Sequence, residues 1–122
     1  MTQISNLYPK PFFELEDRCL KFAQRCQDYV RVLPKDLPNL ENGKQLIRSS
    51  GSVGANYIEA NEGLSKKDFV MKVKIAKKET KESRYWLILT KPLENQIKEQ
   101  QSLIQEAGEV MKIFGAIIEK CK

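Results

Sequence analysis

The chain has 122 residues, of which 41% are hydrophobic and 30% are charged, and its formal net charge is +5. This length suits one domain spanning residues 1–122, because domains commonly contain about 100–150 residues. The sequence contains no histidine, which excludes a Ser-His-Asp triad, a histidine metal ligand and an imidazole proton shuttle. We therefore expect a protein that acts by binding, without a cofactor and without a small-molecule substrate.

Prolines and glycines divide the chain into four segments that are rich in good helix formers. The first is expected to form a helix over residues 12–33, because its apolar residues recur every three or four positions. These residues are Leu15, Cys19, Phe22, Cys26, Tyr29 and Leu33. The three cysteines, which include Cys121, have no CxxC spacing. We therefore interpret Cys19 and Cys26 as small core residues rather than as a disulfide or a zinc pair.

The second helix is expected over residues 39–62. Its apolar stripe contains Leu46, Ile47, Ser50, Val53, Gly54, Tyr57 and Ile58. Glycine inside a helix costs about 0.5–1 kcal/mol relative to alanine. Close approach of a neighbouring helix is the usual compensation, so we expect it at both Gly51 and Gly54.

The third helix is expected over residues 65–90, with Ser65 as its N-cap and Asp68 three residues later. Its inner stripe contains Phe69, Val73, Ala76, Thr80, Ser83, Leu87 and Thr90. The fourth helix is expected over residues 93–120. Its apolar face contains Ile97, Ile104, Ala107, Met111, Phe114 and Ile118, widened by Leu103, Val110 and Ile117. Four such helices with short connections predict an all-α, antiparallel up-down-up-down four-helix bundle.

A ladder of polar side chains follows the second helix. Its members are spaced by four, three, four and three residues, with Arg48 beside them, and they are Gln45, Ser49, Ser52, Asn56 and Glu59. We interpret this ladder as a hydrogen-bonded seam against a neighbouring helix or subunit. The alternative is a catalytic or ligand-binding row, which would need Glu59, Glu79 and Glu82 to share a cleft with a metal.

Positive charge is concentrated in the third helix. Nine basic and three acidic residues lie between Ser65 and Lys91, a net charge of +6, whereas the rest of the chain sums to −1. Seven of the nine fall within about 120° of the helical wheel. This pattern favours a phosphate-binding face for RNA or DNA, and the alternative is an ordinary solvated face. The candidate residues are Lys66, Lys67, Lys72, Lys74, Lys77, Lys78, Lys81 and Arg84.

The third helix also carries a second apolar face, formed by Met71, Ile75, Trp86 and Leu89. A small monomeric bundle buries only one apolar face of each helix, so we expect this second face to form a subunit interface. The alternative is wide burial between two helices of the same bundle.

Residues 1–18 lack the apolar run of a signal peptide, and no stretch approaches a membrane span. A soluble cytoplasmic protein is therefore expected.

A paired signature runs through the second and third helices: Q-x-x-R-S-x-x-S-V-x-A-N-x-x-E from Gln45 to Glu59, then S-x-x-D-F from Ser65 to Phe69. It continues with Ile75-Ala76, Glu79, Glu82 and Trp86-Leu87. With this signature the chain resembles the small bacterial four-helix bundle proteins called 23S rRNA-intervening-sequence proteins. They are related to the accessory variability protein of diversity-generating retroelements.

The resemblance implies an antiparallel four-helix bundle that assembles into a ring-like homopentamer, with no catalytic residue. Members of the family are often encoded within inserts in ribosomal RNA genes. The retroelement relatives bind a reverse transcriptase and nucleic acid through basic surfaces. The polar ladder coincides with the family motif at Gln45, Arg48, Ser49, Ser52, Asn56 and Glu59.

Two functions follow as hypotheses. The first is a non-enzymatic, oligomeric bundle that binds RNA, DNA or a nucleic-acid-handling partner through its basic third helix. The alternative is a protein-binding accessory subunit of a reverse transcriptase, with no nucleic-acid binding of its own.

Overall fold

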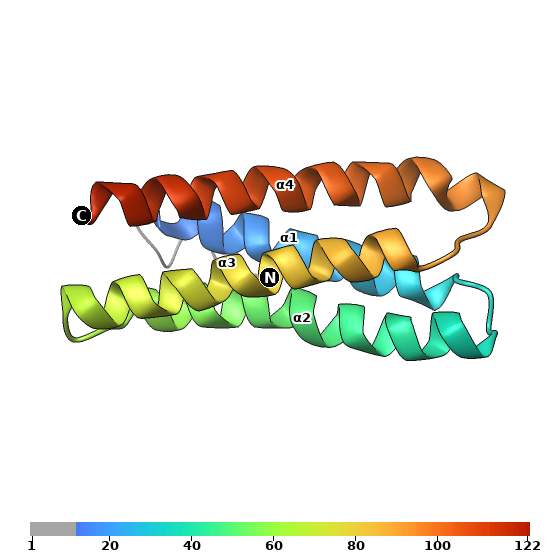
Figure 1. Cartoon of the computed structure of the whole chain (residues 1–122), viewed down its shortest axis with the longest axis horizontal. Coiled ribbons are helices and arrows are strands. Elements are labelled where there is room, and N and C mark those ends of the chain that lie inside the picture. The colour runs from blue at the N-terminus through green and yellow to red at the C-terminus, as the bar shows by residue number, and fades with distance from the viewer. Residues whose placement is uncertain (1–11) are drawn as a thin grey trace, which may run out of the picture.

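The structure is a computed structural model, and it describes residues 12–122. Four long helices follow one another: α1 (Phe12–Arg31), α2 (Leu37–Asn61), α3 (Lys66–Leu89) and α4 (Ile97–Lys120), with the short 3-10 helix η2 (Glu94–Gln96) before α4. Consecutive helices run in opposite directions and lie side by side (Figure 1). The prediction of an antiparallel four-helix bundle is confirmed. Most of the stretch in which a signal peptide was sought lies outside the described residues.

The ends of the helices follow from local hydrogen bonds. Ser65 caps α3 as expected, because its side chain accepts a hydrogen bond from the backbone N–H of Asp68 at 3.1 Å. Asp36 does the same for α2 by accepting from Asn39 N at 2.9 Å. The second helix therefore begins two residues earlier than expected. The fourth begins four residues later, because residues 94–96 form the 3-10 turn.

The core is a line of apolar side chains from all four helices. Cys19, Phe22 and Cys26 of α1 are completely or almost completely buried, as the spacing predicted. Burial raises the pKa of both thiols to about 12, so they remain protonated at neutral pH. Neither forms a disulfide bond. The two cysteines are therefore core residues.

Three expected core positions are wrong. Ile47 and Ile58 of α2 are 40% and 46% exposed, and Ile97 at the start of α4 is 40% exposed. In α2 the buried line runs one residue away from each isoleucine, through Leu46 and Tyr57. A step of one residue turns a helix by about 100°, which moves the side chain to the surface. In α4 the buried line consists of Leu103, Ala107, Val110 and Phe114.

The two glycines of α2 have different surroundings. A Cβ atom at Gly54 would lie 3.2 Å from Cβ of Cys19, so α1 approaches α2 closely at this point. Nothing lies within 4 Å of a Cβ placed at Gly51, which is exposed. The expected close approach is confirmed at Gly54 and is wrong at Gly51.

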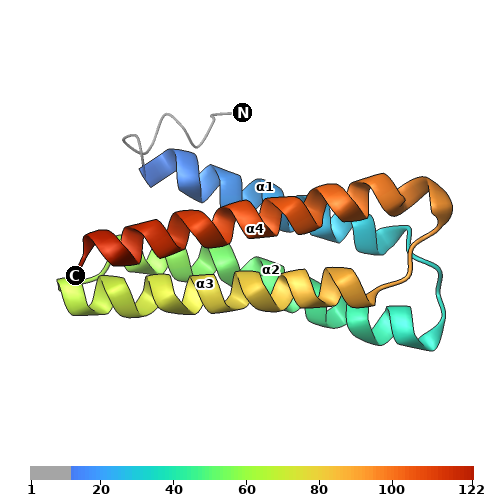
Figure 2. The same cartoon turned by 45° about the horizontal axis from the view of Figure 1, so that its top comes forward.

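The four helices do not pack equally. The packing of α3 against α2 is the most extensive, followed by that of α3 against α4, whereas α1 and α4 have the least extensive packing among neighbouring helices. In Figure 2, α3 passes in front of α2, and α4 lies above it. The helix α3 thus has an α2 edge and an α4 edge, separated by an outward face. These two edges hold most of the charged and polar residues that the sequence singled out as candidates.

Candidate nucleic-acid interface

The α2 edge of α3 is a seam of paired polar groups. Ser49 of α2 and Ser83 of α3 share a buried hydrogen bond of 2.8 Å between their hydroxyl oxygens. Arg48 donates to Glu79 at 3.4 Å and also to Glu82. At the far end of the seam, Lys72 and Glu59 form an ion pair of 2.9 Å.

The remaining members of the ladder make local contacts within α2. Gln45 accepts a hydrogen bond from Arg48 Nε at 3.3 Å. Ser52 donates to the carbonyl of Arg48 at 3.0 Å, and Asn56 donates to the carbonyl of Ser52 at 2.8 Å. Of the five ladder members, only Ser49 and Glu59 therefore bond across to α3, whereas Gln45, Ser52 and Asn56 bond within α2.

The three carboxylates that the catalytic alternative requires do not share one site. Glu79 and Glu82 share Arg48, whereas Glu59 lies further along the seam with Lys72. The pKa of Glu82 is lowered, first by the hydrogen bond from the Trp86 indole N–H at 3.1 Å and then by Arg48. Within residues 12–122, no group of three Asp, Glu, Cys or His side chains is arranged to hold a metal ion.

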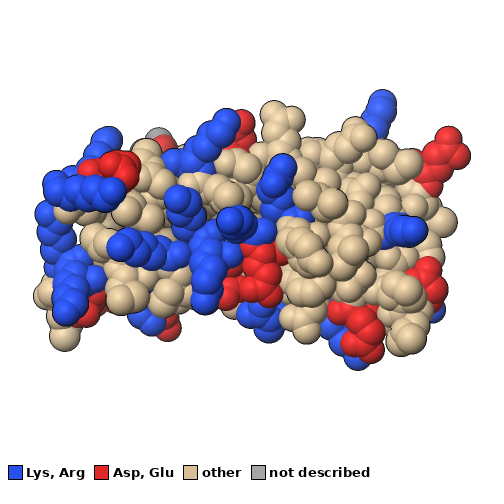
Figure 3. Space-filling view, viewed as in Figure 1, with Lys and Arg blue, Asp and Glu red and all other residues tan. Residues whose placement is uncertain are grey.

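The basic side chains of α3 point outward and toward α4. Figure 3 shows them gathered over one half of the molecule, on the face that α3 and α4 share. In the described part of the chain, seven of the eight candidates form no ion pair with a carboxylate. They are Lys66, Lys67, Lys74, Lys77, Lys78, Lys81 and Arg84. The structure places the eighth, Lys72, apart from them on the α2 edge.

Three adjoining hollows lie among these cations, between α3 and α4. Their volumes are about 520, 450 and 440 Å³. The first two share Lys77 and Met111, and the second and third share Lys74. These three adjoining hollows are together called the basic trough. Its charged lining consists of Lys66, Lys67, Lys74, Lys77, Lys78, Lys81, Arg84, Glu109, Lys112, Glu119 and Lys122.

The trough includes residues that sequence reasoning missed. Lys112 of α4 and Lys122, which follows α4, add cations to the lining, and Gly108 and Gly115 of α4 also line the first hollow. The heptad spacing of the two glycines was the available signal. Of the two carboxylates, Glu119 is ion-paired with Lys122 at 2.8 Å. Lys122, with a further contribution from Lys77, lowers the pKa of Glu119.

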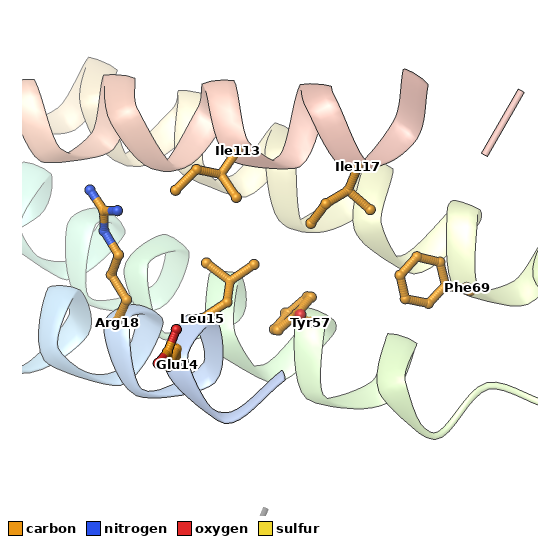
Figure 4. A pocket seen from close by; sticks show the side chains of 7 residues that line it. All are labelled: Glu14, Leu15, Arg18, Tyr57, Phe69, Ile113 and Ile117. Carbon is orange, nitrogen blue, oxygen red and sulfur yellow. The ribbon is translucent and has the colours of Figure 1, made fainter. Parts of the chain in front are cut away.

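A fourth hollow has a different chemistry. It has a volume of about 410 Å³, and Figure 4 shows the apolar side chains of α1, α2, α3 and α4 that line it, including Leu15, Ile113 and Ile117. Arg18 at its edge is held by Glu106 through two hydrogen bonds of 2.8 Å. A site for a specific small molecule needs polar groups that converge on the ligand, and Arg18 is already engaged.

Of the four residues expected to form a subunit interface, two are partly buried within the bundle and two are exposed. Trp86 packs partly against the core and donates to Glu82, and Ile75 is half-buried. Met71 and Leu89 are 54% and 43% exposed. Beyond the cations, the surface carries further exposed apolar side chains near the α3–α4 connection: Tyr85, Ile88, Leu93 and Ile97.

Comparisons with known proteins agree with this architecture. Residues 13–116 match the family described as 23S rRNA-intervening sequence protein. Among solved structures, the chain is similar to a protein of unknown function from the S23 ribosomal protein family of Bacteroides thetaiotaomicron VPI-5482, with 33% identity and a TM-score of 0.71. This similarity covers 85% of the present chain and 97% of the other. No curated protein matches the chain. None of the helices described is both long and apolar enough to cross a membrane.

Proposed function

Because the chain belongs to the 23S rRNA-intervening sequence protein family, we propose that it is a non-enzymatic four-helix bundle that binds nucleic acid through its basic trough. Seven α3 cations carry this proposal, because none of them forms an ion pair with a carboxylate within residues 12–122. Unpaired cations that lie close together repel one another, and a row of phosphates removes that repulsion. The family name, which refers to 23S rRNA, supports RNA as the first ligand to test.

The proposal predicts a steep dependence of binding on salt. Each phosphate contact contributes about −0.9 to the slope of log K against log salt for duplexes, and about −0.7 for single strands. Seven contacts would give a slope of roughly −5 to −6. Fluorescence anisotropy with RNA and DNA oligonucleotides at several salt concentrations measures this slope. Absence of binding to every single strand, duplex and hybrid at 50 mM salt would overturn the proposal.

Exposed apolar surface supports a second part of the proposal, which is assembly of several copies. Leu89 and its exposed neighbours lie beyond the cations, where a second copy would cover them without neutralising the trough. Light scattering of Leu89→Glu tests this assignment, with Leu20→Glu as the matched control, because Leu20 is 41% exposed on α1, away from this surface. If the wild type scatters as a 14.1 kDa monomer at micromolar concentration, the assembly proposal is wrong.

The accessory-subunit alternative makes a different prediction. A subunit that binds only a protein would show no affinity for nucleic acid, while a reverse transcriptase would co-purify with it. Its gene would then lie beside a reverse transcriptase gene. Location of the gene within a ribosomal RNA insert would instead favour the nucleic-acid function.

A further inference from the structure

The shape of the basic trough carries an inference about the kind of nucleic acid, which rests on the proposed function. We infer that the trough seats one single strand, with its sugar–phosphate backbone between α3 and α4 and its bases toward solvent. The inference depends on three features of the trough: its course along α3, the glycines in its lining and the absence of aromatic side chains from its lining.

The first feature is the course of the trough. From Lys66 to Arg84 the α3 wall is about 27 Å long, at 1.5 Å per residue. A strand of a duplex winds around its axis once in about 34–36 Å. Over about 27 Å such a strand makes about three quarters of a turn, so it does not stay beside the α3 wall along its whole length. A single strand, which has no partner strand to wind around, is free to follow the trough along the surface that α3 and α4 share.

The second feature is the floor of the trough. Nothing in the protein lies within 4 Å of a Cβ atom placed at Gly108, and the nearest atom to one at Gly115 is Lys77 Nζ at 3.6 Å. No close helix packing therefore accounts for either glycine, in contrast to Gly54, where Cys19 lies at 3.2 Å. Two missing side chains on one line of α4 leave room for a ligand backbone to approach the helix. Lys77 already extends toward this space.

The third feature is the chemistry of the lining. Between the cations lie aliphatic and thioether side chains, among them Ile104, Met111 and Ile118, which suit contact with sugar rings. The residues described as lining the three hollows include no Phe, Tyr or Trp. Binding of single strands through their bases uses aromatic stacking platforms. The lining therefore favours contact with the backbone and little preference for base sequence.

Filling the floor without changing its charge tests the inference. Gly108→Leu places a side chain in the trough, and Gly51→Leu is the matched control, because Gly51 is also a helix-interior glycine with nothing within 4 Å. Both changes should raise the melting temperature, since leucine favours a helix more than glycine does. The probes are an oligouridylate long enough to span the trough and a duplex RNA of mixed sequence.

We expect Gly108→Leu to separate the strand from Lys77 and Lys112. Loss of two phosphate contacts lowers the salt slope by about 1.4, which corresponds to about 25-fold weaker binding of the oligouridylate at 0.1 M salt. Duplex binding by Gly108→Leu should not change, and Gly51→Leu should bind both probes as the wild type does.

The other outcomes are distinguishable. If the wild type binds neither probe, nor any other nucleic acid, the proposed function fails together with the inference. If the wild type binds RNA but Gly108→Leu keeps its affinity for the oligouridylate, or weakens duplex binding equally, the inference is wrong and the proposed function stands. If a helical, glutamate-rich peptide binds the wild type and Gly108→Leu abolishes only that binding, the trough is a protein-docking groove and the inference is again overturned.

Discussion

The two edges of α3 use the same residue types in opposite ways. On the α2 edge, Lys72 is paired with Glu59, and Arg48 of α2 is paired with two glutamates. On the α4 edge, Lys77 and Lys81 point into a trough in which cations greatly outnumber carboxylates. The charge on the α2 edge is balanced within the bundle, whereas the charge on the α4 edge is not.

This difference shows that a count of charged residues does not separate cations that are paired within the bundle from cations that are not. Lys72 and Lys74 are two positions apart in the sequence, and both were candidates from the concentration of charge. Only the structure separates them, because α2 presents a carboxylate to one and the trough receives the other. Each prediction below changes one edge and asks whether the other edge responds.

The largest expected effect is on binding, and it comes from the α4 edge. The triple variant Lys74→Gln, Lys77→Gln, Lys81→Gln removes three phosphate contacts, which lowers the salt slope by about 2 for a single strand. At 0.1 M salt the affinity then falls about 100-fold, or about 2.8 kcal/mol. Anisotropy titrations measure both quantities. Lys72→Gln is the control on the opposite edge, and an equal loss in that variant would contradict the division of α3 into two edges.

The next effect is on stability, and it comes from the α2 edge. Arg48→Met leaves the carboxylate of Glu79, whose side chain is only 11% exposed, without its cation. The cost should be about 1–2 kcal/mol, because a desolvated charge has lost its partner. Urea unfolding measures it, and adding Glu79→Gln should recover part of the loss. Lys81→Met on the α4 edge should unfold at nearly the wild-type urea concentration, and a comparable loss there would refute the comparison.

The features that could be predicted from the sequence are those that depend on a single helix, such as its buried face and its first residue. The spacing of Cys19, Phe22 and Cys26 identified the buried face of α1, and Ser65 identified the start of α3. Sequence reasoning placed Ile47 and Ile58 in the core because an apolar residue beside a stripe looks like part of the stripe. Periodicity alone does not determine how far around a helix its neighbours extend.

The trough was beyond sequence reasoning for a different reason. It is formed by two helices, and Lys112 and Lys122 are far in sequence from the α3 cations that they face. The same holds for the pairing of Lys72 with Glu59, which depends on the alignment of α2 with α3. Which side chains pair across two helices depends on how the helices are aligned along their axes. This alignment cannot be derived from the spacing of residues within each helix.

A smaller effect is expected from acid. The indole of Trp86 and the guanidinium of Arg48 hold the pKa of Glu82 below its ordinary value of 4.5. Its contribution to stability is therefore complete above pH 4.5 and is lost as the pH falls through the lowered pKa, because the unfolded chain binds the proton first. Urea midpoints measured from pH 6 to pH 3 should fall less steeply for Glu82→Gln than for the wild type. Glu62→Gln, which changes an exposed carboxylate at the C-terminal end of α2, should leave the slope nearly unchanged.

The smallest effect is the response of stability to salt, and here the two edges act in opposite directions. Lys74, Lys77 and Lys81 follow one another at helical spacings of three and four residues, where each pair of like charges costs about 0.2–0.5 kcal/mol. Salt screens this exposed repulsion and stabilises the fold, whereas it weakens the ion pairs of the α2 edge less, because those are partly buried. Raising the salt concentration from 50 to 200 mM should therefore increase the free energy of unfolding by a few tenths of a kcal/mol. The triple glutamine variant should lose this increase and Arg48→Met should keep it. The reverse pattern would place the unbalanced charge on the α2 edge.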